Sequence, residues 1–373
     1  MKVLVTGAKG FVGRNLCLAL EQIPGVEVLK YDLGDESKLE GYLIGCDFVM
    51  HLAGVNRPKN PEDFKTGNTV FTEDILDRLA MRSNPPPLLI SSSIQAELDN
   101  EYGRSKKAAE DAVKAYGEKT GAAVYVYRLA NVFGKWCRPN YNSAIATWVY
   151  NIARDLPIMV RDPDASVTLV YIDDVVTSFI SHLDLSNRVG TKANDIYSVV
   201  PSYTRTLGEI TSLINAFHDE VQTLMIPDQK DDFVKKLYAT YLAALPETDF
   251  SYPLTMHCDN RGSFTEMLHT IERGQVSINV SKPGITKGEH WHHTKHEKFM
   301  VVSGQGEINF RIADNPAAPV ISYRVSGEKL EVVRIPPGYT HNIINVGDTD
   351  MVTVMWANEV FDPNTPDTFR LNV

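Results

Sequence analysis

Short runs of β-branched and aliphatic residues alternate with longer amphipathic stretches through about the first 180 residues. The runs include Val3–Val5, Phe48–Met50, Leu88–Ile90 and Val124–Val126, and each is followed by a segment of helical periodicity. This alternation is typical of parallel strands joined by crossover helices. It predicts a doubly wound parallel α/β sheet in the first part of the chain.

The pattern changes after about residue 250, where short apolar strands are bounded by Gly and Pro. The strands expected there are Val276–Val280, Phe299–Val302, Glu307–Phe310, Leu330–Val333 and Met351–Met355. Closely spaced strands of this kind predict an all-β sandwich or barrel. Pro246 and the Tyr252-Pro253 pair end the helical region, so we expect domains at 1–245 and 246–373.

Composition narrows the classes of function. The chain has 373 residues and a formal net charge of -10. Because no Lys/Arg cluster supplies a basic face, we expect no nucleic-acid partner. We find no apolar run of about 18 residues and no apolar leader, which predicts a cytoplasmic protein without membrane contact. The four cysteines lack CxxC spacing and are expected to be reduced thiols.

A glycine-rich turn follows the first expected strand. Gly7, Gly10 and Gly13 form a GxxGxxG pattern that opens a helix. Glycines there let the backbone approach a pyrophosphate, which the free amides of the helix N-terminus stabilise. A tight turn without a ligand is the simpler interpretation, but the position at the first strand–helix junction favours a Rossmann-like dinucleotide site.

The form of the dinucleotide depends on the end of the second expected strand. Lys30 there suits the 2′-phosphate of NADPH, whereas Asp32 suits the free ribose hydroxyl of NADH. We expect NADPH, with NADH as the alternative.

A candidate acid–base pair lies further along the chain. Tyr102 and Lys106 are four residues apart, so they face the same side of a helix. A nearby ammonium group would lower the pKa of the phenol and make it a usable proton donor. YxxxK alone is common on solvated helices, but here the serine run Ser91–Ser93 follows a strand just before it.

Together with His51–Gly54, Arg128–Gly134 and Tyr171–Val175, these motifs resemble the extended short-chain dehydrogenase/reductase family over about the first 240 residues. The resemblance implies that Tyr102 is the proton donor, that Lys106 holds the nicotinamide ribose, and that Ser93, with Ser92 as the fallback, steadies the substrate oxygen. It also implies that Asn131 touches a nucleotide-sugar diphosphate. The cofactor-binding residues it implies are Gly7, Gly10, Phe11, Val12, Gly13, Lys30, Ala53 and Lys106.

Histidines gather in the C-terminal part. His290 and His292 are two apart on an expected strand and would point to one face, where Glu297 and His341 could complete a site of three histidines and one carboxylate. That donor set suits a divalent metal such as zinc. A single histidine would more simply be a hydrogen-bonded core residue, but the whole set matches the signature of the cupin family, a jelly-roll barrel. His293 and His296 fall outside the pattern.

A second resemblance covers the same part of the chain as the cupin signature. Asp259–Glu266 and Ser281–His290 resemble nucleotide-sugar 3,5-epimerases of the cupin fold, although a hairpin turn with solvated charges would also fit Asp259–Glu266. The resemblance implies that Arg261 and Lys287 bind substrate and that Glu266 contacts the sugar or positions Arg261. It also implies a histidine base, which conflicts with His290 as a metal ligand because a ligated nitrogen cannot accept a proton.

A reductase joined to an epimerase-like cupin resembles bifunctional enzymes of capsular polysaccharide biosynthesis. The resemblance implies C3 epimerisation of a UDP-4-keto-6-deoxy-N-acetylhexosamine and then C4 reduction to UDP-2-acetamido-2,6-dideoxy-L-talose, in a homodimer. Two alternatives remain: a redox-neutral epimerase with bound NAD whose cupin serves only for dimerisation, and a ligand-sensing module without turnover.

Overall fold

The computed structural model describes residues 1–58, 60–183 and 195–373, which form two compact units. The first unit contains Met1–Asn215 and Lys235–Pro246, and the second contains Ala216–Val234 and Glu247–Val373. The segment Ala216–Val234, expected in the first domain, groups with the second unit because backbone hydrogen bonds tie Leu224 and Ile226 to His269. The division at 245/246 stays a proposal.

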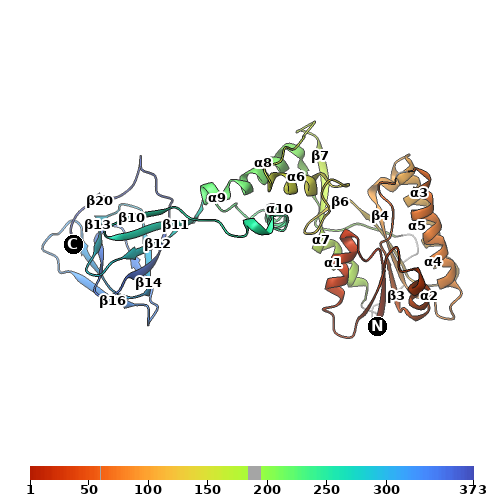
Figure 1. The fold of residues 1–373 in the computed structure, drawn as a ribbon, viewed down its shortest axis with the longest axis horizontal. Coiled ribbons are helices and arrows are strands. Elements are labelled where there is room, and N and C mark those ends of the chain that lie inside the picture. Colours follow the sequence, from red (N-terminus) through yellow and green to blue (C-terminus); the bar gives the residue numbers. More distant parts are fainter. Residues whose placement is uncertain (59, 184–194) are drawn as a thin grey trace. The chain divides into compact units, whose positions relative to one another are not determined.

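The first unit is built on a parallel sheet of strand order β2-β1-β3-β4-β5-β8. Helices α1 and α7 pack on one face, and α2, α4 and α5 on the other (Figure 1). This confirms the doubly wound α/β class. The elements are β1 (Lys2–Thr6), α1 (Phe11–Leu20), β2 (Glu27–Tyr31), α2 (Glu36–Gly45), β3 (Phe48–His51), α4 (Phe71–Ala80), β4 (Leu88–Ser93), α5 (Glu101–Thr120), β5 (Val124–Leu129), α7 (Ile172–Ile180) and β8 (Ile196–Tyr197).

Further elements lie outside this sheet, and those at Glu220–Thr223 and Glu247–Asp249 belong to the second unit. A smaller sheet has the order β6-β7-β9. These elements are α3 (Glu62–Phe64), a π-helical turn (Lys65–Val70), β6 (Asn131–Phe133), α6 (Ala144–Ile152), β7 (Ser166–Tyr171), β9 (Tyr203–Thr206), α8 (Leu207–His218), α9 (Glu220–Thr223) and α10 (Asp232–Leu242), with 3₁₀ turns at Ile94–Glu97, Ser181–Leu183 and Glu247–Asp249.

Helix α5 has local signals at both ends. The side chain of Asn100 accepts a hydrogen bond from the Gly103 amide, which caps the helix N-terminus. Gly121 ends the helix with a φ of 74°, a conformation that glycine adopts without a steric penalty. Because Tyr102 and Lys106 lie in the first two turns, the cap fixes where both side chains begin.

The second unit consists of two antiparallel sheets with the strand orders β10-β11-β12-β19-β14-β17 and β16-β15-β18-β13-β20. A core that includes Phe299, Ile308 and Ile343 packs between them, which confirms the all-β class. The strands are β10 (Met256–Asp259), β11 (Gly262–Thr270), β12 (Gly274–Ser281), β13 (Thr286–Trp291), β14 (Glu297–Ser303), β15 (Gln305–Ile312), β16 (Ile321–Ser326), β17 (Val333–Ile335), β18 (Tyr339–Asn345), β19 (Met351–Ala357) and β20 (Phe369–Arg370).

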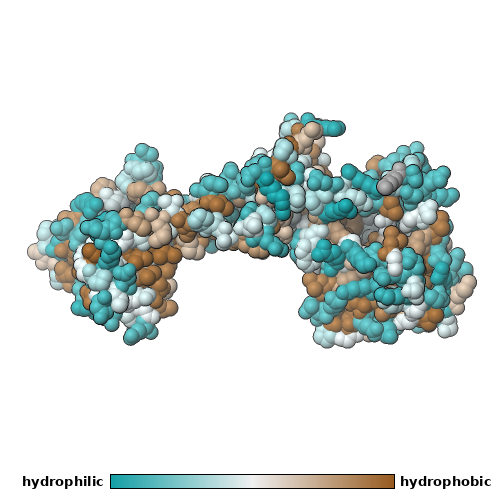
Figure 2. Space-filling model, viewed as in Figure 1, coloured by the Kyte–Doolittle hydropathy of each residue, from teal (hydrophilic) through white to brown (hydrophobic). Residues whose placement is uncertain are grey.

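Surface polarity is mixed on the face drawn in Figure 2, where hydrophilic residues cover much of each unit and hydrophobic ones lie between them. Within the described ranges, none of the helices has both the length and the apolar character needed to cross a membrane.

Candidate active sites

The glycine-rich turn lies between β1 and α1, and its glycines are sterically required. Gly7 has a φ of 71°, and a Cβ atom on it would lie 2.8 Å from the amide nitrogen of Ala53. A Cβ on Gly13 would lie 2.1 Å from the carbonyl oxygen of Gly7. Helix α1 has no side-chain cap, so its first amides remain available to a ligand. The turn therefore fits the pyrophosphate of a dinucleotide.

A cavity of about 1280 Å³ opens at the carboxyl ends of the parallel strands. Its lining brings together most of the residues expected in the first site. These are Gly7, Gly10, Phe11, Val12, Gly13, Ala53, Ser93, Tyr102, Lys106 and Asn131. Lys30 is not among the lining residues, because its ammonium group pairs with Glu21 at 2.5 Å. Asp32 does line the cavity.

Ser93, Tyr102 and Lys106 meet in this cavity. The Ser93 hydroxyl hydrogen-bonds the phenol of Tyr102. Ser92 is engaged elsewhere, because its hydroxyl donates to the buried Glu110 carboxylate at 2.5 Å. The geometry therefore supports Ser93, rather than Ser92, as the serine beside the reacting group.

The electrostatics of Tyr102 differ from the sequence expectation. Burial raises the pKa of the phenol, and the hydrogen bond from Ser93 only partly offsets this. The Lys106 ammonium donates to the carbonyl of Ser91 at 3.1 Å, and burial lowers its own pKa to about 8. The phenol is thus held in its protonated form, which is the form that a proton donor requires.

A buried ion pair beneath these residues was missed by the sequence analysis. Glu110 is fully buried, one helical turn after Lys106, and its carboxylate accepts hydrogen bonds from Arg128 at 2.9 and 2.8 Å. Glu110 also raises the pKa of Lys106 against the effect of burial. Glu110 follows Lys106 by four residues on α5, so the sequence could have indicated that the two side chains lie close together. Its ion-pair partner Arg128 lies on β5, and no local spacing indicates that contact.

Asn68 is a second residue that sequence reasoning missed. It lies in the π-helical turn, is buried, and hydrogen-bonds both the backbone of Val55 and the Ser105 hydroxyl. A Cβ on Gly54 would lie 2.8 Å from Asn68 Oδ1 and 3.1 Å from the Lys106 ammonium. Gly54 therefore packs directly against both Asn68 and the catalytic candidate Lys106.

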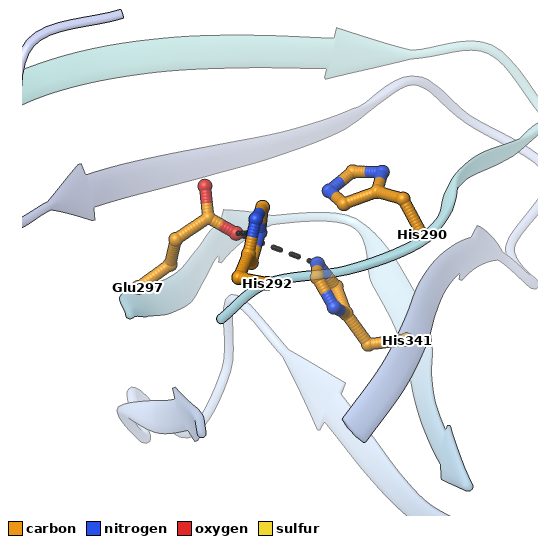
Figure 3. A group of neighbouring side chains, drawn as sticks. All are labelled: His290, His292, Glu297 and His341. Atoms are coloured by element: carbon orange, nitrogen blue, oxygen red, sulfur yellow. Dashed lines mark ion pairs between the residues drawn. The ribbon is translucent and has the colours of Figure 1, made fainter. Parts of the chain in front are cut away.

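The second unit brings the four expected metal ligands together. Their donor atoms lie within 4.8 Å of one another (Figure 3). His290 on β13 pairs in register with His341 on β18, while His292 follows β13 and Glu297 begins β14. His293 and His296 are exposed, as expected for residues outside the pattern.

The chemistry of these donors fits a divalent cation. Glu297 Oε2 lies 3.4 Å from the Nε2 atoms of both His292 and His341, and these three buried atoms have no hydrogen-bond partner among the described residues. Burial lowers the pKa of His290 to about 4, which keeps its imidazole neutral. Glu297 and the Asp367 backbone raise the pKa of His292 in spite of its burial. Three imidazoles beside a carboxylate are the donor set that zinc or a similar metal binds.

The C-terminal segment holds this cluster in place. The carbonyl oxygen of Asp367 accepts a hydrogen bond from His292 Nδ1 at 2.6 Å, which leaves Nε2 facing Glu297. The carboxylate of Asp367 accepts from the amides of residues 293–295 at 2.8–2.9 Å. Asp367 therefore orients one ligand and ties down the loop between His292 and Glu297.

Of the three residues expected to bind substrate in the second unit, two line a cavity and one does not. Arg261 and Lys287 line a cavity of about 270 Å³ together with His290, Glu297 and His341. Arg261 forms an ion pair with Asp259, and the Lys287 ammonium donates to Asn279 at 2.7 Å and to the Val280 carbonyl at 2.9 Å. Glu266 lies outside the lining, with a carboxylate oxygen 3.7 Å from His269.

Comparison with known proteins agrees with this division. The model of the NAD dependent epimerase/dehydratase family matches residues 3–199, and the model of the polysaccharide biosynthesis C-terminal domain matches residues 257–369. The chain therefore belongs to the NAD dependent epimerase/dehydratase family and carries a polysaccharide biosynthesis C-terminal domain.

Individual relatives match the full length of the chain. It is 47% identical to the UDP-2-acetamido-2,6-beta-L-arabino-hexul-4-ose reductase of Pseudomonas aeruginosa PA103, over 100% of this chain and 99% of the relative. The crystal structure of the capsular polysaccharide assembling protein CapF from Staphylococcus aureus covers 100% of both chains, with 49% identity and a TM-score of 0.92. CapF with the inhibitor 3-isopropenyl-tropolone matches with 46% identity and a TM-score of 0.88, again over 100% of both chains. The expected resemblance to a capsular polysaccharide enzyme is confirmed.

The ion pair of Glu110 with Arg128 predicts that a substitution at Glu110 lowers stability more than one at the neighbouring, exposed Asp111. Glu110→Gln should lower the free energy of unfolding by about 2 kcal/mol, because the two guanidinium hydrogen bonds to this fully buried group lose their charged acceptor, while Arg128 keeps its exposed partner Glu97. Urea denaturation of the full chain measures this. The matched control is the neighbouring Asp111→Asn, which removes an exposed pair with Lys107 and should change the value by less than about 0.5 kcal/mol. Equal effects of the two changes would contradict this account.

Proposed function

We propose that the chain is a bifunctional nucleotide-sugar enzyme. Its second unit epimerises C3 of a UDP-4-keto-6-deoxy-N-acetylhexosamine, and its first unit then reduces the C4 ketone, giving UDP-2-acetamido-2,6-dideoxy-L-talose. The observation that carries the proposal is that Ser93, Tyr102 and Lys106 line one cavity with the glycine-rich turn, in a chain 47% identical to a UDP-sugar reductase over its full length. A cytoplasmic homodimer with a cupin-type second domain is part of the proposal.

Reduction assigns a separate role to each polar group. A nicotinamide dinucleotide whose pyrophosphate lies on the glycine-rich turn would supply the hydride. Tyr102 donates its phenolic proton to the C4 oxygen, and Ser93 holds that oxygen by a hydrogen bond. Lys106, whose buried ammonium donates to the Ser91 carbonyl at the cavity lining, would hold the nicotinamide ribose. We propose NADPH as the donor, with NADH as the alternative.

Epimerisation assigns the second unit a different task. Arg261 and Lys287 supply positive charge at the cavity that contains the metal-ligand cluster, as an anionic diphosphate requires. We propose that His290, His292, Glu297 and His341 hold zinc or a similar divalent metal, which would act as a Lewis acid toward a carbonyl oxygen. With its lone pair directed to a metal, His290 could not also act as the base.

Tyr102→Phe should lower the rate of ketone reduction by about 10²-fold or more, because it removes the proton donor. Oxidation of the reduced nicotinamide in the presence of the 4-keto sugar, followed by absorbance, measures this. Cofactor affinity should stay near the wild-type value, since the glycine-rich turn is intact. Tyr116→Phe, on the same helix and outside the cavity lining, is the control and should retain normal turnover. Reduction above a tenth of the wild-type rate in Tyr102→Phe would refute the assignment.

Metal content tests the histidine cluster. Protein purified without chelators should contain about one divalent ion per chain, and His341→Ala should lower both that content and the thermal stability of the second unit. Asp367→Ala should also lower metal content, because the loop between His292 and Glu297 loses the carboxylate that accepts its amides, although the backbone carbonyl that bonds His292 remains.

The control for Asp367 is Asp362→Ala. Asp362 lies in the same segment, but its carboxylate binds Asn364 and Thr365 rather than the ligand loop. Its metal content should match that of the wild type. Wild-type protein without metal would return His290 to the role of base.

The order of the two reactions follows from carbon acidity. The C3 proton can be removed only while C4 is a ketone, because the adjacent carbonyl delocalises the carbanion as an enolate. In deuterated water, Tyr102→Phe should therefore leave deuterium at C3 of the recovered 4-keto sugar without consuming nicotinamide. Mass and NMR spectra detect the label.

Variants of the second unit decide where this exchange occurs. Arg261→Ala should slow it, whereas Arg324→Ala, which alters an exposed pair with Glu307 outside the cavity, should not. If C3 stays protiated in Tyr102→Phe, the second unit is not the epimerase, and the alternative in which it serves only for dimerisation is favoured.

A further inference from the structure

Strand β13 directs two side chains into the second cavity whose spacing does not fit a regular strand. Lys287 and His290 both line this cavity, and they are three residues apart on the strand. Side chains of a regular strand alternate between its two faces, so residues three apart point in opposite directions. The geometry of β13 must therefore change between Lys287 and His290.

The change is a β-bulge at Glu289. Gly288 pairs with Asn342 on β18. The next pair joins His290 to His341, so two steps along β13 match one step along β18. Glu289 is thus the extra residue of the bulge. In a strand without this extra residue, His290 would turn to the opposite face, away from His341.

The bulge brings His290 into the metal-ligand cluster. Its imidazole lies beside that of His341, with ring centroids 4.6 Å apart (Figure 3). The ring of His292 is also close, at 4.9 Å. Lys287, before the bulge, lines the same cavity. One strand therefore supplies both a cationic group and a metal-ligand candidate to one cavity, which regular alternation would not allow.

The backbone of Glu289 is strained. Its φ is 60°, in the left-handed region that residues other than glycine rarely adopt. Such a conformation persists only where the surrounding structure imposes it.

Three hydrogen bonds hold Glu289 in this conformation. Its carboxylate accepts from the side-chain amide of Asn342 at 2.9 Å and from the backbone amide of Val373 at 2.8 Å. Its carbonyl oxygen accepts from the Leu371 amide at 3.1 Å. The donors come from β18 and from the C-terminal segment, so the bulge is fixed from both sides of β13.

From this arrangement we infer that Glu289 is a positioning residue of the second site, whose bulge turns His290 into the metal-ligand cluster. Glu289 itself does not line the cavity, so it acts through His290 rather than by touching substrate or metal. The inference rests on the metal site proposed above for the second unit.

Zinc affinity of the full-length protein tests the inference without any sugar substrate. After removal of metal, competition with a chromophoric chelator gives the dissociation constant for zinc. Glu289→Ala should raise this constant by about tenfold or more, because it removes both side-chain hydrogen bonds and keeps the strained backbone.

Glu289→Gly separates strain from ordinary strand stability. It loses the same two side-chain hydrogen bonds but adopts the left-handed conformation without a steric penalty. It should therefore bind zinc about threefold more tightly than Glu289→Ala, or better. Glycine ordinarily destabilises a strand relative to alanine, so a residue that only supported the strand would give the reverse order.

Two further variants locate the effect. Glu307→Ala is the matched control, because it removes a glutamate from the same sheet that pairs with Arg324 outside the cavity, and its zinc affinity should stay within about twofold of the wild type. In a His290→Ala background, Glu289→Ala should weaken zinc binding by less than about twofold more, since the ligand that it positions is already missing.

Several outcomes would overturn the inference while leaving the metal proposal standing. These are wild-type zinc affinity in Glu289→Ala, weaker binding by Glu289→Gly than by Glu289→Ala, or the full loss repeated in the His290→Ala background. If circular dichroism shows that Glu289→Ala does not fold, Glu289→Gln replaces it. This variant keeps one acceptor oxygen and should lose about threefold in affinity, and an unchanged affinity would overturn the inference equally. Failure of the wild type to bind zinc would reject the metal proposal together with the inference.

Discussion

Removal of charged groups from water is the constraint that shapes both candidate sites. In the first unit, Lys106 and Glu110 lie one helical turn apart on α5 and are both buried. Arg128 and Ser92 complete the hydrogen bonding of the Glu110 carboxylate, so the protein itself compensates this charge. A buried charge without such partners would cost several kcal/mol.

In the second unit, the protein compensates the buried charge only in part. Glu297 lies between His292 and His341 at 3.4 Å from each, yet the facing donor atoms have no hydrogen-bond partner among the described residues. Burial opposes ionisation of Glu297, but the two facing imidazoles outweigh it and hold the pKa of the carboxyl well below its usual range. A bound divalent cation would satisfy the carboxylate oxygen and the facing imidazole nitrogens together. This difference distinguishes a ligand cluster from the satisfied network around Glu110.

Local patterns in the sequence were sufficient for the fold classes and for much of both sites. The glycine spacing of Gly7, Gly10 and Gly13 predicted a turn in which Gly7 and Gly13 are sterically required, and the histidine spacing predicted a cluster that the structure assembles. A single turn or a pair of strands imposes each of these spacings, so the pattern can be recognised in the sequence itself.

Long-range partners could not be read in the same way. Nothing near Lys30 in the sequence shows that Glu21 captures its side chain, and nothing near Glu266 shows that it lies outside the second cavity. The effect of Lys106 on Tyr102 was also overestimated. Helical spacing brings two side chains to one face, but it does not reveal how strongly burial raises the pKa of a phenol.

The two proposed reactions need opposite proton chemistry, which explains why one chain would carry two sites. Reduction requires a donor that keeps its proton until the hydride arrives, and burial of Tyr102 raises its pKa in that direction. Epimerisation requires removal of a proton from carbon, for which a protonated phenol beside an ammonium group is unsuited. A site that stabilises an enolate instead needs positive charge near the carbonyl oxygen. Arg261, Lys287 and a cation held by the histidine cluster would provide it at the second cavity.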